Sequence, residues 1–468
     1  MTRVVIIGGG PGGYEAALVG RQLGGDVTLI ERRGLGGSAV LTDVVPSKTL
    51  IAAAEVMTQL RSADSLGLRM RDGGDIGAAV EVDMAQVHAR IKALAKAQSD
   101  DIYDRLIADG IRVISGTGRL NGAAEVIAAT EAGEEKLPAD IIQISVGAHP
   151  RELDTAKPDG ERIFNWSQIY DLDTLPSRLI VVGSGVTGAE FASAYRALGV
   201  EVTLISSRHQ VLPGQDDDAA AVIQQVFTDR GIEIYNDARA VGAENTGDSV
   251  RVLLADGREV WGSHCLMAVG GIPNTSGIGL EEAGVELDSG GRIKVDKVSR
   301  TSVRGIYAAG DCTDSFALAS VAAMQGRIAM WHSLGDAVSP LNTRSVCANV
   351  FTAPEIATVG VGQQDLDDGF NARAITLPLS SNARAKMRDM RDGFVKIFCL
   401  PTTHIIVGGV VVSPSASELI HPLSLAVRHK LTVEQLSEAF TVYPSLSGSI
   451  AEAARRLHGH ENERVILY

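Results

Sequence analysis

Cysteine is scarce in this 468-residue chain, and the four that occur are far apart. They are Cys265, Cys312, Cys347 and Cys399, and no two of them form a C-x-x-C pattern. This usage is typical of reduced core thiols in a cytosolic protein and not of a disulfide framework. Thiol chemistry that uses a pair of these cysteines is therefore the least favoured activity.

Basic stretches and long apolar stretches are also lacking. The net charge is -14, and no part of the chain is strongly basic, which argues against a nucleic-acid partner. No apolar run is long enough to span a bilayer, and Met1 leads directly into the strand-like run of residues 4–7, which leaves no room for a signal peptide. The ten histidines show no paired ligand spacing, so no metal site is predicted. We expect a cytoplasmic protein without stable membrane insertion.

Glycine, in contrast, is abundant, and it marks two segments that resemble each other. Residues 4–31 read VVIIGGGPGGYEAALVGRQLGGDVTLIE, and residues 179–206 read LIVVGSGVTGAEFASAYRALGVEVTLIS. Each has an apolar strand, a glycine-rich turn, an amphipathic helix and a second strand that ends near VTLI. This pattern is typical of the βαβ unit that binds a dinucleotide. Two copies in full context predict two bound dinucleotides.

The three glycines of each turn have different roles. The first permits the tight turn, the second lets the backbone approach a pyrophosphate at the helix N-terminus, and the third lets helix and strand pack closely. In chain order they are Gly8, Gly10 and Gly13 in the first copy and Gly183, Gly185 and Gly188 in the second.

The two copies differ where the second strand ends. Glu31 ends the first copy and is placed to accept hydrogen bonds from an adenosine ribose. Ser206 stands at this position in the second copy, and Arg208 follows two residues later. Without a carboxylate to repel a 2′-phosphate, and with a guanidinium to bind it, the second site favours NADPH, although NADH is not excluded.

The whole chain resembles the flavoprotein disulfide reductases, the family of dihydrolipoamide dehydrogenase and glutathione reductase. An ordered set of motifs carries this resemblance: GGGPGG at 8–13, ISVGAHP at 144–150, AVGGIPNT at 268–275, GIYAAGDC at 305–312 and NVFTAPEIATVG at 349–360. It implies an α/β protein with two Rossmann-like dinucleotide-binding domains and an α+β dimerisation domain that forms a homodimer. The implied limits are 1–152 for the first part of the FAD domain, 153–276 for the NAD(P)H domain, 277–345 for the second, central part of the FAD domain and 346–468 for the interface domain.

The resemblance also assigns roles to further residues. Asp311 is expected to bond the ribityl chain of FAD, and the backbone at Ala319 to approach the flavin. Gly118 and Gly147 are further expected FAD contacts, and Gly270 is an expected NAD(P)H contact.

The family's two redox cysteines are missing. The stretch GLGGSAVLTDVVPSK matches the family at Gly36-Gly37 and at residues 46–48, so the cysteine positions fall on Ala39 and Val44. Neither side chain forms a thiolate, which excludes disulfide exchange here. The family's terminal histidine and glutamate are likewise replaced, by Tyr443 and Gly448, and a tyrosine is a poor base at neutral pH.

Lys48 and Glu190 are retained where the family places a lysine–glutamate pair beside the flavin ring. We therefore expect an active enzyme with Lys48, Glu190 and Tyr443 as candidate catalytic residues. Tyr443 from the other subunit either covers the acceptor or donates a hydrogen bond to it, or it serves interface packing alone. Without a disulfide, the acceptor must reach the flavin itself.

A quinone is the preferred acceptor, because Ala39 and Val44 make an apolar cleft and because the chain most resembles the thiol-less, LpdA-type branch whose members act as NAD(P)H:quinone reductases. The expected reaction is a ping-pong hydride transfer from NAD(P)H to FAD and then to the quinone. A soluble pyridine-nucleotide transhydrogenase and a flavin-bound redox sensor without turnover remain alternatives. The physiological acceptor, and whether it takes one or two electrons, stays open.

Overall fold

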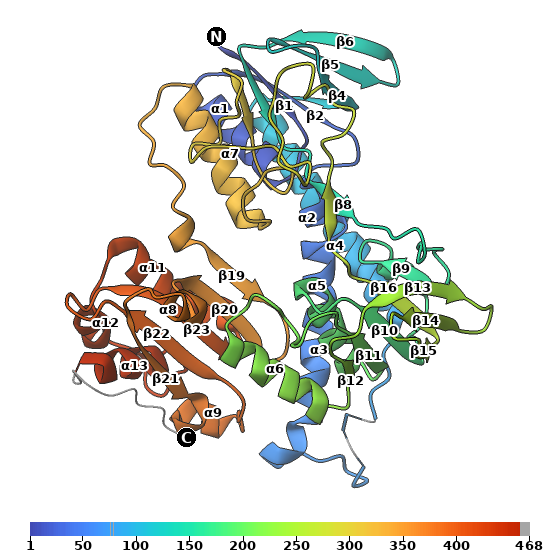
Figure 1. Ribbon diagram of the computed structural model, residues 1–468, viewed down its shortest axis with the longest axis vertical. Coiled ribbons are helices and arrows are strands. Elements are labelled where there is room, and N and C mark those ends of the chain that lie inside the picture. The colour runs from blue at the N-terminus through green and yellow to red at the C-terminus, as the bar shows by residue number, and fades with distance from the viewer. Residues whose placement is uncertain (75, 78, 459–468) are drawn as a thin grey trace.

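The computed structural model describes residues 1–74, 76–77 and 79–458, and it shows three units of α/β or α+β structure (Figure 1). The first unit lies at the top of the view, the second at the lower right and the third at the lower left. Every helix within the described ranges is too short or too polar to cross a membrane.

The first unit is built on a parallel five-stranded sheet in the order β18-β7-β1-β2-β3. Strand β1 is a continuous run of Val and Ile after its first residue, as expected where both faces of a parallel sheet are covered. In sheet order, the strands span Ile306–Ala308, Ile141–Ile144, Arg3–Ile7, Asp26–Glu31 and Arg112–Ser115.

One face of this sheet is covered by helices, and the other by an antiparallel sheet. On the helical face, α1 (Pro11–Gln22) packs closely on α7 (Ala319–Ser333), because a Cβ on Gly326 would lie 2.1 Å from the Gly12 carbonyl oxygen. The covering sheet on the other face consists of β4 (Thr117–Leu120), β5 (Glu125–Thr130) and β6 (Gly133–Pro138). Strand β1 is thus packed between the helices and the antiparallel sheet, which holds the glycine turn after β1 in place.

The second unit repeats the arrangement with a parallel sheet in the order β12-β11-β10-β16-β9. In sheet order the strands span Glu233–Tyr235, Glu201–Ile205, Arg178–Val182, His264–Met267 and Ile163–Asn165. Two helices, α5 (Val186–Ala197) and α6 (Asp217–Asp229), and a small antiparallel sheet complete it; the small sheet comprises β13 (Ala240–Asn245), β14 (Val250–Leu254) and β15 (Glu259–Gly262).

A two-stranded ribbon connects the first and second units. Strand β8 (Ala148–Pro150) pairs antiparallel with β17 (Gly271–Pro273), with His149 opposite Ile272. The chain therefore enters the second unit and returns from it at the same place. The second unit is an insertion between two parts of the first.

The third unit is an antiparallel sheet in the order β19-β20-β23-β22-β21. The strands span Cys347–Val350, Glu355–Gly360, Ile406–Ser413, Phe394–Cys399 and Arg373–Pro378 in that order. Helices α11 (His421–His429), α12 (Val433–Glu438) and α13 (Gly448–His458) cover one face, and the shorter helices are α8 (Gln363–Asp367), α9 (Ala383–Met387) and α10 (Ala416–Leu419).

The other face of this sheet packs against the second unit. Phe394 and Phe398 share one hydrophobic core with Phe191 and Tyr195 of α5. Between the two phenylalanines, the side chain of Lys396 is 1% exposed, and its Nζ lies 2.9 Å from Asp216 and 2.6 Å from Asp218. Every residue of β22 is therefore buried, and a buried ion pair joins the two units.

Three further helices lie between the units. They are α2 (Gly37–Leu41), α3 (Val44–Arg61) and α4 (Met84–Ala108). Leu50, Ile51 and Ala54 on α3 belong to the core that contains α5 and the third unit's sheet. Helix α3 thus holds residues of the first unit against both other units.

Candidate functional site

The first glycine turn has the geometry that a dinucleotide needs. Gly8 has φ +98°, and a Cβ there would lie 2.3 Å from the Ser145 carbonyl oxygen. A Cβ on Gly13 would lie 1.9 Å from the Gly8 carbonyl oxygen. Gly10, in contrast, faces open space, and as the N-cap of α1 it leaves the first-turn N–H groups without a side-chain cap. A pyrophosphate fits this open, positively polarised helix end.

The second glycine turn has the same features, with nearly the same distances from a Cβ on its first and third glycines to nearby carbonyl oxygens. Gly183 has φ +107°, and a Cβ there would lie 2.3 Å from the Ala268 carbonyl oxygen. A Cβ on Gly188 would lie 1.8 Å from the Gly183 carbonyl oxygen, whereas Gly185, the N-cap of α5, faces open space. The residues of both turns fit a dinucleotide, one at each helix N-terminus.

The two strand ends place Glu31 and Ser206 differently. The carboxylate of Glu31 accepts hydrogen bonds of 2.7 Å from the backbone N–H groups of Gly9 and Arg33, so it lies beside the first turn. Ser206 is fully buried, and its hydroxyl lies 2.7 Å from that of Ser184. The structure therefore uses the Ser206 side chain to hold the second turn, whereas Arg208 is exposed near this turn.

Three further predicted FAD contacts lie in strands of the first unit or shortly after them. Asp311 follows β18, and burial raises the pKa of its carboxyl, while Arg292 lowers it. Gly147 follows β7 with φ +66°, and Gly118 lies in β4, where a Cβ would come within 2.9 Å of Ile7. Because carboxyl ends of parallel strands form the ligand-binding edge of such a sheet, Asp311 and Gly147 share one edge.

Two predicted contacts remain, Ala319 and Gly270. Ala319 is the first residue of α7. Gly270 lies beyond β16 with φ +94°, and a Cβ there would meet open space.

Lys48 and Glu190 form an ion pair between two units. Lys48 Nζ, on α3, lies 2.7 Å from Glu190 Oε2, on α5, and the side chains are 27% and 4% exposed. The other oxygen, Oε1, accepts a hydrogen bond of 2.9 Å from the backbone N–H of Phe351, and Lys48 Nζ lies 4.9 Å from the centre of the Phe351 ring. The buried carboxylate is thus paired on both oxygens, and it fixes the direction of the lysine.

The predicted positions of the missing cysteines lie on the segment that ends at Lys48. Ala39 is in α2 and Val44 begins α3, and both are half-buried. The four cysteines elsewhere are free, and burial raises the pKa of each thiol: to about 12 for Cys265, to about 11 for Cys312 and Cys399, and in the same direction for Cys347. None of these thiols is poised for exchange chemistry at neutral pH.

Asp43 is a residue of this site that the sequence reading did not single out. Its carboxyl lies in the field of Lys48, Glu190 and Asp311, and it is the N-cap residue of α3 without capping the helix. Burial raises its pKa to about 6; Lys48 lowers the value, and Glu190 and Asp311 raise it. The signal in the sequence was its position directly before Val44, where a charged side chain adjoins a predicted cysteine position.

Tyr443 lies on the third unit, in the segment between α12 and α13. Its side chain is 85% exposed, and the neighbouring Phe440 and Val442 are exposed as well. Gly448, the counterpart of the family's glutamate, is the first residue of α13. The structure leaves Tyr443 outside the core of its own chain, and its expected place beside the partner's cofactor stays a prediction.

Two dinucleotide units, one inserted into the other and joined by a buried lysine–glutamate pair, define the class of two-dinucleotide flavoprotein oxidoreductases. Comparison with known families gives the same result. The model described as "Pyridine nucleotide-disulphide oxidoreductase" matches residues 2–326, and its dimerisation domain matches residues 346–454. The chain belongs to this family. The predicted family, fold class and cofactors, FAD and NAD(P)H, are thereby confirmed.

Individual relatives extend the comparison. The chain is 52% identical to a Mycobacterium tuberculosis protein named NAD(P)H dehydrogenase (quinone), over 99% of this chain and 95% of the relative. It is 31% identical to a dihydrolipoyl dehydrogenase of Zymomonas mobilis, over 97% and 98%. The crystal structure of LpdA from M. tuberculosis superimposes with a TM-score of 0.92 at 52% identity, covering 98% of this chain and 100% of that one. RclA of Escherichia coli, at 22% identity and a TM-score of 0.84 over 97% and 99%, shares the fold.

Proposed function

We propose that this chain is an NAD(P)H:quinone oxidoreductase. The first glycine turn would hold FAD and the second NAD(P)H, and bound FAD would supply the ping-pong hydride transfer from NADPH or NADH to a quinone. One observation carries the proposal: Lys48 and Glu190 form an ion pair at 2.7 Å, on a segment where Ala39 and Val44 stand at the positions that the resemblance gives to two cysteines. The relative named NAD(P)H dehydrogenase (quinone) supports it at 52% identity.

In this proposal Lys48 is aimed by its neighbours. Glu190 accepts a hydrogen bond from the Lys48 ammonium on one carboxylate oxygen and from the Phe351 N–H on the other. These contacts fix the position of the ammonium group. A cation fixed in this way favours the arrival of a hydride nearby, because its charge is already oriented before the reaction. Glu190 and Phe351 are positioning residues for Lys48.

Asp43 supplies the proton in this proposal. Reduction of a quinone to a hydroquinone consumes one hydride and one proton. With a pKa of about 6, the Asp43 carboxyl is poised to lose a proton near neutral pH, as a general acid requires. It donates this proton to a quinone oxygen and recovers one from solvent, while Ala39 and Val44 supply an apolar wall for the quinone ring.

The nicotinamide donor and the partner subunit complete the proposal. Arg208, exposed beside the second turn, binds the 2′-phosphate and favours NADPH over NADH. The chain forms a homodimer through its matched dimerisation domain, and Tyr443 of one subunit covers the quinone site of the other. The exposed apolar side chains around Tyr443 support this, because exposed apolar clusters on a folded chain mark contact surfaces.

Anaerobic stopped-flow spectroscopy tests the proposal. The flavin of the purified protein is reduced with NADPH or NADH and then mixed with menadione, lipoamide or thio-NAD in turn. Rapid reoxidation by menadione alone supports the quinone reductase, whereas rapid reoxidation by thio-NAD would indicate a transhydrogenase. Turnover with lipoamide would contradict the assignment of Ala39 and Val44. If neither NADPH nor NADH reduces the flavin, the result would favour the alternative function, a flavin-bound redox sensor without turnover.

A matched variant tests the role of Asp43 in the same instrument. Asp43→Asn should slow reoxidation by menadione and leave reduction by NADPH nearly unchanged, because only the second half-reaction needs the proton. Loss of a general acid typically costs about 100-fold or more. Equal effects on both half-reactions would show that Asp43 shapes the flavin environment and does not donate the proton.

A further inference from the structure

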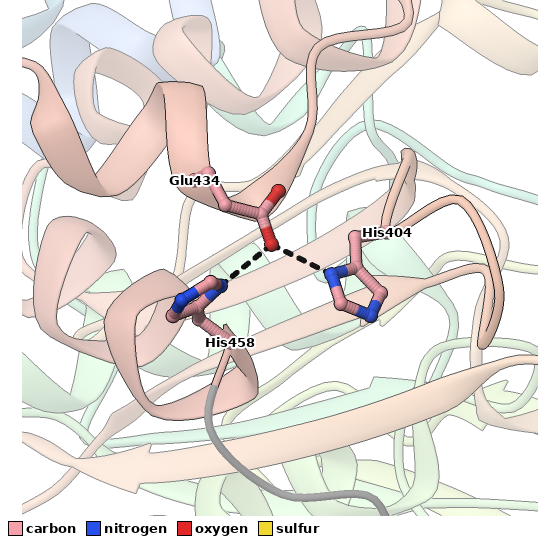
Figure 2. A group of neighbouring side chains, drawn as sticks. All are labelled: His404, Glu434 and His458. Carbon is pink, nitrogen blue, oxygen red and sulfur yellow. Dashed lines mark hydrogen bonds and ion pairs between the residues drawn. The ribbon is translucent and has the colours of Figure 1, made fainter.

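Three side chains with metal-ligating atoms meet on the third unit, away from both glycine turns (Figure 2). They are His404 and His458, which flank Glu434. The Nδ1 atoms of His404 and His458 lie 2.6 Å and 2.7 Å from the same carboxylate oxygen, Oε1 of Glu434. All three potential ligand atoms lie within 4.8 Å of one another. Three donors therefore converge on one point.

Each of these residues comes from a different element, and each element is held by other contacts. His404 lies in the turn between β22 and β23 with φ +55°, and its N–H donates to the Leu400 carbonyl at 3.0 Å. Glu434 is in the first turn of α12, which the Thr432 hydroxyl caps. His458 is the last residue of α13, where Arg373 donates to the carbonyl of the preceding residue, Leu457, at 3.0 Å.

The framework around the cluster is equally fixed. The N–H of Val433 donates to the His404 carbonyl at 3.0 Å, which ties the start of α12 to the turn. Helix α13 packs along α12 and across β21 and β22. The three ligand-bearing positions are therefore set by the backbone before any ion arrives, which is the condition for a preorganised site.

We propose that His404, Glu434 and His458 form a binding site for a divalent cation of the zinc type. Two imidazole nitrogens and one carboxylate oxygen are a set that Zn²⁺ prefers, at distances near 2 Å. Binding needs the tautomer of each imidazole in which the proton is on Nε2, because this leaves Nδ1 free to bind the ion. The imidazoles and the carboxylate must also move slightly apart to admit the ion. His404 and Glu434 are half-buried and His458 is exposed, so water completes the coordination.

Glu434 presents one carboxylate oxygen to both imidazoles, which lie on either side of it. A bound cation would tie the end of α13 to the turn at His404, which makes the site a structural tether.

Zinc binding by the FAD-loaded protein tests the site. After treatment with a chelator and its removal, equilibrium dialysis with Zn²⁺ at pH 7.5 should show one tight site per chain. His404→Ala and Glu434→Gln should each weaken it at least tenfold. His429→Ala, at an exposed position of α11, is the matched control and should bind Zn²⁺ as the unaltered protein does.

A second readout separates a lost ligand from a misfolded protein. Saturating Zn²⁺ should raise the melting temperature of the unaltered chain by about 3 °C at a hundredfold excess over the dissociation constant, and it should not raise that of His404→Ala. Bound flavin and menadione turnover should be equal in all three variants, because the cluster lies outside the proposed reaction site. Absence of saturable binding, or equal binding by His404→Ala, would overturn the proposal.

Discussion

Replacing Asp43 by asparagine should stabilise the protein at neutral pH, although it removes a proposed catalytic group. Burial raises the pKa of this carboxyl from 3.8 to about 6, with Lys48 lowering it and Glu190 and Asp311 raising it. One pKa unit corresponds to about 1.4 kcal/mol, so a rise of about two units means that the ionised carboxylate costs the folded chain about 3 kcal/mol. Such a cost at a functional group is a common trade of stability for activity.

The pH dependence of this cost has a definite sign. Between pH 3.8 and about pH 6, Asp43 is ionised in the unfolded chain but protonated in the folded chain, so the folded chain binds the extra proton. The contribution of Asp43 to stability is therefore fully present below pH 3.8 and is lost as the pH rises through 6. Asparagine cannot ionise. The variant should gain about 3 kcal/mol at pH 7.5 and almost nothing at pH 4.

Melting temperatures of the FAD-loaded proteins, measured from pH 4 to pH 8, test this reasoning. With an unfolding entropy of about 2.1 cal/mol/K per residue, a chain of this length that unfolds as one unit should melt about 3 °C higher at pH 7.5. Asp248→Asn, at an exposed loop position, is the matched control. A gain of equal size at every pH, or a loss at pH 7.5, would refute the argument.

Substitutions at three further positions test other parts of the structure. Lys48→Met should slow flavin reduction by NADPH at least tenfold in stopped-flow measurements, and Lys48→Arg, which keeps the charge, should restore part of the rate. Arg208→Ala should raise the KM for NADPH about 10- to 100-fold and leave that for NADH unchanged, since a charge-assisted hydrogen bond contributes about 1.5–3 kcal/mol. Lys396→Met leaves Asp216 buried without its cation and should destabilise the protein by about 3–5 kcal/mol, seen as a lower melting temperature. A melting temperature equal to that of the unaltered protein would mean that water enters this interface.

The local parts of the fold were predictable from the sequence, because short-range patterns specify them. The glycine spacing after residues 4–7 and 179–182 determines a strand, a turn and a helix, and the structure forms both. Lys396 shows where such patterns end. In the run FVKIFC an alternating pattern would place lysine on a solvated face, yet it is buried against Asp216 and Asp218, 180 and 178 residues away. Only the packing of two units determines this environment.

The sites show the same division. The positions of Lys48 and Glu190 were expected from family resemblance, but nothing local indicates that the Phe351 N–H bonds the carboxylate 161 residues earlier in the chain. The cluster of His404, Glu434 and His458 was missed because its members lie 30 and 24 residues apart, and a search for ligand spacing along the chain finds only ligands on one element. The expectation of no metal site stays untested until the binding experiment is done.

The loss of the thiols and the presence of Asp43 are connected in the proposed function. A redox disulfide gives an enzyme of this family both a relay for electrons and groups that take up protons. Once Ala39 and Val44 replace the cysteines, electrons must pass directly to the acceptor, but the reaction still consumes a proton in a largely desolvated cleft. Asp43 adjoins one of the positions predicted for the missing cysteines, and burial, with a smaller contribution from Glu190 and Asp311, raises the pKa of its carboxyl and keeps it protonated to a higher pH than usual. The same burial that destabilises the folded chain at neutral pH therefore provides the acid that a quinone requires, so stability and the menadione half-reaction should change in opposite directions when Asp43 is replaced.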